Sequence, residues 1–175
     1  KLDKAKARGI RKKVLRAMVV GIPNVGKSSF INKIAGKQTT ATGNKPGVTR
    51  KNQWVRLNDR IQLLDTPGVL WPKFENETLA RHLAYIGTIK DEIIDVEELS
   101  LHLVEELFKS EKDKLFERYK IDADFEYEMP LDVLEEIGRK RGCLVRGGVI
   151  DYTKVANIIL DEFRSGKIGR ITIEK

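Results

Sequence analysis

A glycine-rich segment near the start of the chain has the residue types and spacing of a phosphate-binding loop. Gly21 to Ser28 reads Gly-Ile-Pro-Asn-Val-Gly-Lys-Ser and matches the pattern G-x-x-x-x-G-K-[ST]. The glycines let backbone N–H groups wrap closely around phosphate oxygens. Lys27 can reach the β- and γ-phosphates, and Ser28 can offer a hydroxyl to magnesium. The segment therefore predicts a site for a nucleoside triphosphate with magnesium.

A second segment supplies the acidic group that such a magnesium site needs. Asp65 ends an apolar run and begins the sequence Asp-Thr-Pro-Gly, which finishes at Gly68. Asp65 is placed to hold magnesium through water, and the N–H of Gly68 is placed to meet the γ-phosphate and so to sense its loss. A plain strand followed by a Pro-Gly turn would look the same. Its place about 40 residues after the phosphate loop favours the functional interpretation.

Four threonines compete for the position that closes over magnesium. Thr49, in the sequence Pro-Gly-Val-Thr, is the leading choice, and Thr39, Thr40 and Thr42 are the alternatives. We expect magnesium to be held by Ser28, Thr49 and Asp65, and the catalytic groups to be Lys27, Thr49 and Gly68. The residues expected to contact the nucleotide are Pro23, Asn24, Val25, Gly26, Lys27, Ser28, Ser29, Thr49, Asp65 and Gly68.

The elements that must position these residues are a strand before the phosphate loop and a helix after it. Residues 17–20 are an apolar run that predicts a buried, parallel strand. Residues 28–35 have helical spacing, and Gly36 suits the C-cap. Residues 54–57 and 61–64 predict two strands joined by a tight turn. This order predicts an α/β domain.

The second half of the chain predicts helices. From about residue 78 apolar side chains recur at helical spacing, Pro130 suits the first turn of a helix, and residues 155–163 form the last helix. Residues 171–173 predict a short final strand. We expect the boundary near residues 88–95. The expected domains are a basic lead-in at 1–16, a nucleotide-binding domain at 17–92 and a helical domain at 93–175.

Several stretches together resemble a known family. GIPNVGKS, PGVT and DTPGVLWPKF are similar to the circularly permuted GTPases of the YlqF/RbgA family, as are the basic lead-in and KRGCLVRGGVIDYTK, so the resemblance covers essentially the whole chain. It implies an α/β P-loop NTPase fold, a circularly permuted G domain that is partial here, followed by a small, mostly α-helical domain that docks on RNA. The implied ligands are GTP or GDP and magnesium. The implied function is a GTP-driven assembly factor for the large ribosomal subunit, which binds ribosomal RNA in its GTP state and leaves on hydrolysis.

The chain departs from that family in one motif. No Asn-Lys-x-Asp sequence, which recognises guanine in these GTPases, occurs in it. The family carries this motif before the phosphate loop, so we expect the family's N-terminal portion to be missing here. Two other functions therefore stay open at this point. One is an ATP-using P-loop enzyme such as a small-molecule kinase, and the other is a non-hydrolysing RNA-binding module.

The residue after Gly68 bears on how hydrolysis would work. Ras-like enzymes carry a glutamine there that orients the attacking water, but this chain has Val69. The resemblance implies slow intrinsic hydrolysis that the ribosomal subunit and potassium stimulate. Asn24 matches an asparagine that helps to hold potassium in stimulated relatives; the alternative is that it only adopts an unusual backbone angle. His82 and His102 are expected to be surface groups.

Charge is unevenly distributed along the chain. The formal net charge is +7, and residues 1–16, with eight basic side chains and one acid, carry all of it, whereas residues 76–130 hold fifteen acids and seven bases. This pattern predicts a polyanion-binding surface built from residues 1–16 and from the segment Arg139–Arg146. The alternatives are a solvated basic arm and a helix C-terminus stabilised by its own basic residues.

Composition excludes some classes of protein. The apolar fraction of 41% suits a packed core, and no apolar run approaches the roughly 18 residues that span a bilayer. Cys143 is the only cysteine, so neither an internal disulfide nor a cysteine-based metal site can form. We expect a monomeric, cytoplasmic protein, with the mitochondrial matrix as the alternative, and no DNA or membrane partner.

Overall fold

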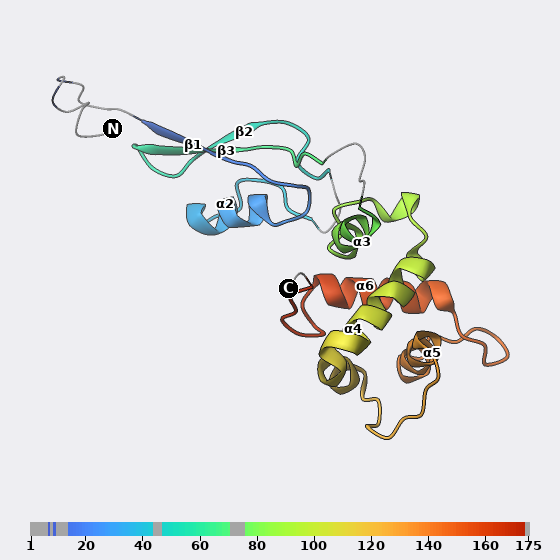
Figure 1. The fold of residues 1–175 in the computed structure, drawn as a ribbon. Helices are drawn as coiled ribbons and strands as arrows, with labels where there is room; N and C mark the ends of the chain where they lie inside the picture. Colours follow the sequence, from blue (N-terminus) through green and yellow to red (C-terminus); the bar gives the residue numbers. More distant parts are fainter. Residues whose placement is uncertain (1–6, 8, 10–13, 44–46, 71–75, 174–175) are drawn as a thin grey trace. The chain divides into compact units, whose positions relative to one another are not determined.

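The computed structural model describes residues 7, 9, 14–43, 47–70 and 76–173. Most of the expected basic lead-in, Pro46 and residues 71–75 fall outside these described residues. The chain divides into two compact units, Lys1–Lys73 and Phe74–Lys175 (Figure 1). This division lies before the boundary expected near residues 88–95. The reason is that the helix over 77–85 contributes Ala84 and Tyr85 to the helical core of the second unit.

The first unit is a three-stranded sheet with one helix. Its elements are β1 (Leu15–Val19), α2 (Lys27–Ala35), β2 (Gln53–Arg56) and β3 (Ile61–Asp65). The strand order is β1-β3-β2, with β1 parallel and β2 antiparallel to β3. The predicted strands and helix are confirmed, each within about two residues.

The register of β1 and β3 brings the two predicted motifs together. Val19 is paired with Asp65, so the strand that enters the phosphate loop and the strand that ends in the acidic group finish side by side. The Thr66 hydroxyl donates to the Val19 carbonyl at 2.7 Å and reinforces this junction. Parallel pairing puts both carboxyl ends at the same edge of a sheet, and the site is built at that edge.

The core of the first unit is small. Ile31 of α2 packs with Val55 of β2 and Leu63 of β3. The expectation that the strand before the phosphate loop is buried is wrong, since Met18 of β1 is 61% exposed. Among the described residues β1 pairs along one edge only, with β3, and α2 rests on β2 and β3. The apolar run of β1 is therefore exposed in the part of the chain that the structure describes.

The second unit is helical. It consists of α3 (Glu77–Tyr85), a short 3-10 turn η1 (Asp91–Ile93), α4 (Val96–Tyr119), α5 (Pro130–Lys140) and α6 (Tyr152–Arg164). Pro130 starts α5, as predicted. The long helix α4 is kinked at Glu111, whose φ of −144° is not helical. The core is formed by apolar side chains of α4, α5 and α6, among them Leu103, Leu107, Ile137, Val155 and Ile159.

The predicted final strand is wrong. Residues 171–173 adopt no regular structure, and Ile171 and Ile173 pack, partly buried, against the helical core. A strand needs a neighbouring strand to take up its backbone hydrogen bonds, and the described residues of this unit hold a single isolated bridge, between Leu144 and Ile150. Within the described residues, no helix has the length and apolar character needed to cross a membrane.

Candidate functional site

The phosphate loop runs from the end of β1 into α2 with the backbone shape that its glycines predict. Gly26, the N-cap of α2, has a φ of 84°, and Asn24 has a φ of 59°, so both adopt the left-handed conformation. Because the N-cap residue is a glycine, no side chain caps the start of the helix. The first N–H groups of a helix then remain available, together with the positive end of the helix dipole, to an anion.

A cavity of about 690 Å³ opens over this loop. Its size falls within the range of about 300–1,000 Å³ that is usual for small-molecule sites. It is lined by the phosphate loop, by Gly68 and by two stretches of the loop after α2, 41–43 and 47–49. Eight of the ten residues expected to contact nucleotide line this cavity: Pro23, Asn24, Gly26, Lys27, Ser28, Ser29, Thr49 and Gly68. Val25, which is half-exposed, and Asp65, which is buried, do not.

Three oxygen-bearing side chains meet beside the cavity. The Ser28 hydroxyl donates to Asp65 Oδ2 at 2.7 Å and lies 3.0 Å from Thr49 Oγ1. Asp65 is fully buried, and its Oδ1 has no hydrogen-bond partner among the described residues. Burying a carboxylate without a full set of partners is costly. Hydroxyl and carboxylate oxygens are the ligands that magnesium prefers, so this group fits a magnesium ion held jointly with phosphate oxygens.

The geometry favours Thr49 among the four threonines. Its hydroxyl is beside Ser28, whereas the hydroxyls of Thr39 and Thr40 bond to the side chain of Asn32, each at 3.1 Å. Thr42 lines the cavity but, among the described residues, makes no hydrogen bond to Ser28 or Asp65. Thr49 thus remains the proposed ligand that closes over the metal.

Lys27 lies within the phosphate loop. Its Nζ donates to the carbonyls of Gly21, at 3.1 Å, and Ile22, at 2.7 Å. Burial lowers the pKa of Lys27 below its ordinary value, and the nearby Asp65 carboxylate opposes this shift. The ammonium group is held next to the backbone N–H groups that would cradle a phosphate. From this position its positive charge can form a charge-assisted hydrogen bond to a phosphate oxygen.

Gly68 is required by a close approach of two loops. A Cβ at this position would lie 2.4 Å from both Cα and N of Pro23, a distance that only glycine avoids. The next residue, Val69, donates its N–H to the Gly21 carbonyl at 3.3 Å, while its side chain is 76% exposed. The backbone of the segment that follows Asp65 is therefore docked on the phosphate loop, and Val69, the residue directly after Gly68, has no polar group that could orient water.

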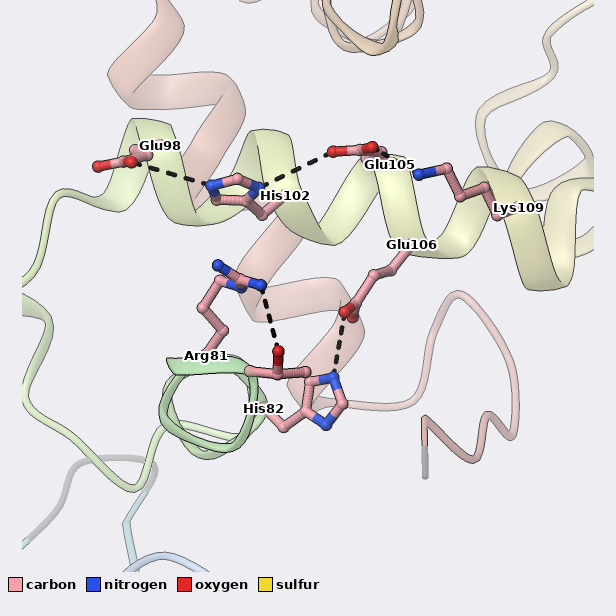
Figure 2. A network of polar contacts seen from close by, with 8 residues as sticks. Arg81, His82, Glu98, His102, Glu105, Glu106 and Lys109 are labelled. Atoms are coloured by element: carbon pink, nitrogen blue, oxygen red, sulfur yellow. Dashed lines mark hydrogen bonds and ion pairs between the residues drawn. The ribbon is translucent and has the colours of Figure 1, made fainter. Parts of the chain in front are cut away.

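The two histidines belong to the second unit and are paired with acids. His82 of α3 lies 3.1 Å from Glu106, and His102 of α4 lies 3.8 Å from both Glu98 and Glu105 (Figure 2). The expectation of surface groups is wrong for His82, whose side chain is only 16% exposed. Both rings lie beside carboxylates, His82 between two helices and His102 along its own helix, which accounts for them without a catalytic role.

The basic run at the end of α5 is paired with acids of its own unit. Arg139 Nη2 lies 2.8 Å from Glu135, Lys140 Nζ lies 3.6 Å from Glu136, and Arg141 bonds to the buried Glu162. These contacts favour the alternative in which the run stabilises the helix and its neighbours. The first two pairs are i,i+4 contacts on the helix surface, and the third joins α5 to α6.

Arg146 differs from that run. It lies in a tight hairpin in which Val145 N–H donates to the Val149 carbonyl at 2.8 Å, and Gly147 and Gly148 have positive φ. Arg146 is exposed and forms no ion pair with any described residue. Of the predicted polyanion-binding segment, this guanidinium is the group left available to an external phosphate.

A strand, a glycine loop, a helix and the acidic end of a second strand, arranged around one cavity, define a P-loop nucleotide-binding domain. Comparison with known proteins gives the family. The model of the family described as 50S ribosome-binding GTPase matches residues 16–130. The chain belongs to this family of GTPases, and the predicted fold class and family resemblance are confirmed.

Individual relatives agree with this assignment. The chain is 45% identical to Ribosome biogenesis GTPase A of Bacillus cereus, over 99% of this chain and 58% of the relative. It is 32% identical to the protein of the same name from Thermotoga maritima, over 93% of this chain and 57% of the relative. The chain thus spans somewhat more than half the length of these curated relatives.

Solved structures show the same fold. GDP-bound TM YlqF matches with a TM-score of 0.58 and 29% identity, over 99% of this chain and 66% of that one. GNP-bound YlqF from T. maritima matches with the same score and identity, over 99% and 64%. Related proteins are thus known with a diphosphate and with the ligand abbreviated GNP.

Proposed function

We propose that this chain carries the phosphate-binding and switch parts of a GTP-driven assembly factor for the large ribosomal subunit. It would bind GTP or GDP with magnesium, associate with ribosomal RNA in its GTP state, and leave on hydrolysis. The observation that carries the nucleotide part is the meeting of Ser28, Thr49 and the buried Asp65 beside the phosphate loop. The names of the relatives support the ribosomal part.

The roles of the residues follow from their positions. The phosphate-loop backbone and Lys27 would neutralise the β- and γ-phosphates, and Ser28, Thr49 and Asp65 would hold magnesium, which when bound neutralises charge on the phosphates. Thr49 and Gly68 stand on two different loops. Both loops would be tied to the γ-phosphate region, so its loss would release them together.

The nucleotide and the partner can be tested in one assay. Phosphate release would be followed with GTP and with ATP, each with and without purified large subunits. We expect release from GTP, faster in the presence of subunits. Release from ATP that subunits do not change would instead support a small-molecule enzyme. Binding to subunits without any phosphate release would support a non-hydrolysing RNA-binding module.

Potassium should accelerate hydrolysis relative to sodium. The physical reason is that Val69 cannot orient or polarise the attacking water. A cation near the phosphates would then help to stabilise the charge that develops in the transition state. Asn24 is placed in the cavity wall and is the proposed potassium ligand. Replacing sodium by potassium at constant ionic strength should raise the rate, and Asn24→Ala should abolish the difference.

Asn24→Gly is the control for this experiment. Glycine tolerates the φ of 59° that Asn24 adopts, so this variant keeps the loop shape and removes only the amide. If Asn24→Gly responds to potassium like the parent, Asn24 has a backbone role and the potassium proposal fails for this residue.

Arg146→Glu should weaken binding to large subunits and flatten its dependence on salt. A lost phosphate contact lowers the slope of log affinity against log salt by about 0.7 to 0.9. Arg146 is chosen because it is exposed and unpaired within the described residues, unlike Arg139–Arg141. Sedimentation with purified subunits across a salt series would measure both the affinity and the slope.

Lys109→Glu is the matched reversal of charge. Lys109 is exposed and lies on α4, in the acidic stretch of the chain, beside Glu105. We expect its variant to bind subunits with an unchanged slope. Equal effects of the two reversals would mean that only the net charge matters, and the hairpin would no longer be the proposed contact.

A further inference from the structure

Asn32, in the interior of α2, makes a set of hydrogen bonds that the mechanism above does not use. Its Oδ1 accepts from the backbone N–H groups of Thr39, at 2.8 Å, and Thr40, at 2.9 Å. Its Nδ2 donates to the Thr40 carbonyl at 2.9 Å. A side-chain amide can accept and donate hydrogen bonds at once. Here the oxygen and the nitrogen of Asn32 both bond to one turn of the loop that follows α2.

The contacts around this turn are dense. Thr40 is only 3% exposed, and its hydroxyl lies within hydrogen-bond distance of Asn32 Oδ1, at 3.1 Å, and of the Ser28 carbonyl, at 3.2 Å. From the other side, Gln53 Nε2 at the start of β2 donates to the Thr39 carbonyl at 3.0 Å. Thr39 and Thr40 are therefore tied to the helix that carries Ser28 and to the first residue of β2.

The residues that follow this turn are the wall of the nucleotide cavity. Ala41, Thr42 and Gly43 line it directly after Thr40, and Gly47, Val48 and Thr49 line it further along. The two stretches approach each other, since a Cβ on Gly43 would lie 3.1 Å from Val48 Cγ2. The point at which the wall leaves the body of the domain is therefore the pair Thr39–Thr40.

We propose that Asn32 is a positioning residue that holds Thr39 and Thr40 in place, the root from which the cavity wall, residues 41–43 and 47–49, extends. With the root held by the helix, the changes that follow binding and loss of the γ-phosphate are confined to the wall itself. Without Asn32 the wall would have to be ordered by the nucleotide. The inference rests on the proposed nucleotide-binding function and adds to it a residue that sets how strongly the site prefers a triphosphate.

Asn32→Ala should weaken a non-hydrolysable GTP analogue more than GDP. If the ordered wall is populated in about a tenth of the molecules without its root, the affinity of a ligand that needs the wall falls about tenfold. The analogue needs it, because Thr49 at the far end of the wall closes on the metal and γ-phosphate. GDP needs it less, so we expect its affinity to change by less than about threefold.

Limited trypsin digestion gives a readout that does not depend on nucleotide. Lys37 lies two residues before Thr39, with Gln38 between them. Loss of the Asn32 hydrogen bonds in Asn32→Ala should raise the rate of cleavage after Lys37 by about tenfold, because local opening governs cleavage in a folded protein. A saturating amount of the analogue should restore protection. A role of Asn32 confined to the stability of α2 would not produce this pattern.

Two further variants complete the test. Asn157→Ala removes the same side chain from the interior of α6. Among the described residues, this amide bonds only to the Thr153 carbonyl of its own helix, so the variant should leave both readouts unchanged. Asn32→Asp keeps the acceptor for the two N–H groups and loses the donor, so it should restore part of the preference, and it replaces Asn32→Ala if that variant does not fold.

The outcomes separate this inference from the proposed function. Unchanged cleavage and an unchanged ratio of analogue to GDP affinity in Asn32→Ala would overturn the role of Asn32. If the parent protein binds neither nucleotide, the proposed function fails, and cleavage after Lys37 alone decides whether Asn32 holds the loop. Equal weakening of both nucleotides with normal cleavage would also overturn the inference.

Discussion

Ser28→Ala should remove the magnesium dependence of nucleotide binding, and Lys27→Ala should weaken binding with or without magnesium. Each change deletes a charge-assisted contact to the phosphates or the metal. Such a contact is worth about 1.5–3 kcal/mol, which corresponds to roughly 10- to 100-fold in affinity. Titration of a fluorescent GTP analogue with magnesium and with a chelator would measure both effects.

Ser28→Ala should also cost stability when magnesium is absent. The Ser28 hydroxyl bonds to Asp65 Oδ2, and Asp65 Oδ1 already has no partner among the described residues. The variant therefore leaves a fully buried carboxylate without this donor, at a cost of about 1–3 kcal/mol. Saturating magnesium should reduce the loss, since the metal would compensate the same carboxylate.

Two controls keep this prediction specific. Ser28→Thr retains the hydroxyl and should retain the magnesium dependence. Lys33→Ala removes an exposed positive charge from the last turn of the same helix and should leave affinity nearly unchanged. A Ser28→Ala protein that responds to magnesium like the parent would show that this hydroxyl is not a metal ligand.

Much of the nucleotide site can be predicted from sequence because its chemistry is local. Gly26, Lys27 and Ser28 belong to a loop of eight residues whose sequence pattern alone predicts phosphate binding. Gly36 ends the helix because glycine readily adopts the left-handed conformation. Asp65 is found because an acid at the end of an apolar strand is conspicuous. These features depend on neighbours in the chain.

The parts that could not be predicted depend on contacts between distant residues. Asn32 looks like an ordinary polar residue on a helix, and only the fold shows that Thr39 and Thr40 bond to it. Thr49 stands out among four threonines only once Ser28 is beside it. Residues 171–173, Ile-Thr-Ile, are all β-branched, as is typical of a strand, but no described strand pairs with them.

The predicted basic surface at Arg139–Arg141 illustrates the same limit. In sequence these residues form a run of positive charge, and nothing in that run shows that each has an acidic partner. Arg141 contacts Glu162, 21 residues further along, and Lys140 lies 3.5 Å from Asp122, 18 residues earlier. A charge count measures how many basic groups are present, whereas binding depends on how many remain unpaired.

Glu162→Gln should unfold the second unit more readily than any surface substitution. Glu162 of α6 is only 8% exposed and accepts from Arg118 of α4, at 2.9 and 2.7 Å, as well as from Arg141 after α5. One carboxylate thus joins three helices. Removing one member of a buried ion-pair group costs about 3–5 kcal/mol, because the remaining charges lose their partner. For a unit of this size, that lowers the midpoint of thermal unfolding by at least about 10 °C.

Glu117→Gln is the control, because it removes an equal charge from an exposed residue of α4 next to Arg118. We expect it to change the free energy of unfolding by no more than about 0.5 kcal/mol. Similar melting of the Glu162→Gln and Glu117→Gln proteins would show that the three-helix junction contributes little. Loss of subunit binding in a variant of Arg141 would be ambiguous for the same reason, since this arginine supports the fold.

Acid should abolish the difference between Glu162→Gln and the parent. Burial raises the pKa of Glu162, but the hydrogen bonds and charges of Arg118 and Arg141 lower it by more. The net result is a pKa of about 2, against an ordinary value of 4.5. A carboxyl whose pKa is lower in the folded state stabilises the protein fully above the unfolded value and loses this contribution as pH falls through the folded value. The parent should therefore be the more stable protein at neutral pH, and its advantage should shrink between about pH 4.5 and pH 2. Urea unfolding of both proteins across this range would measure the gap. A gap that stays constant would mean that the stability of the junction does not come from the ionised carboxylate, and packing of the Glu162 side chain would then account for it.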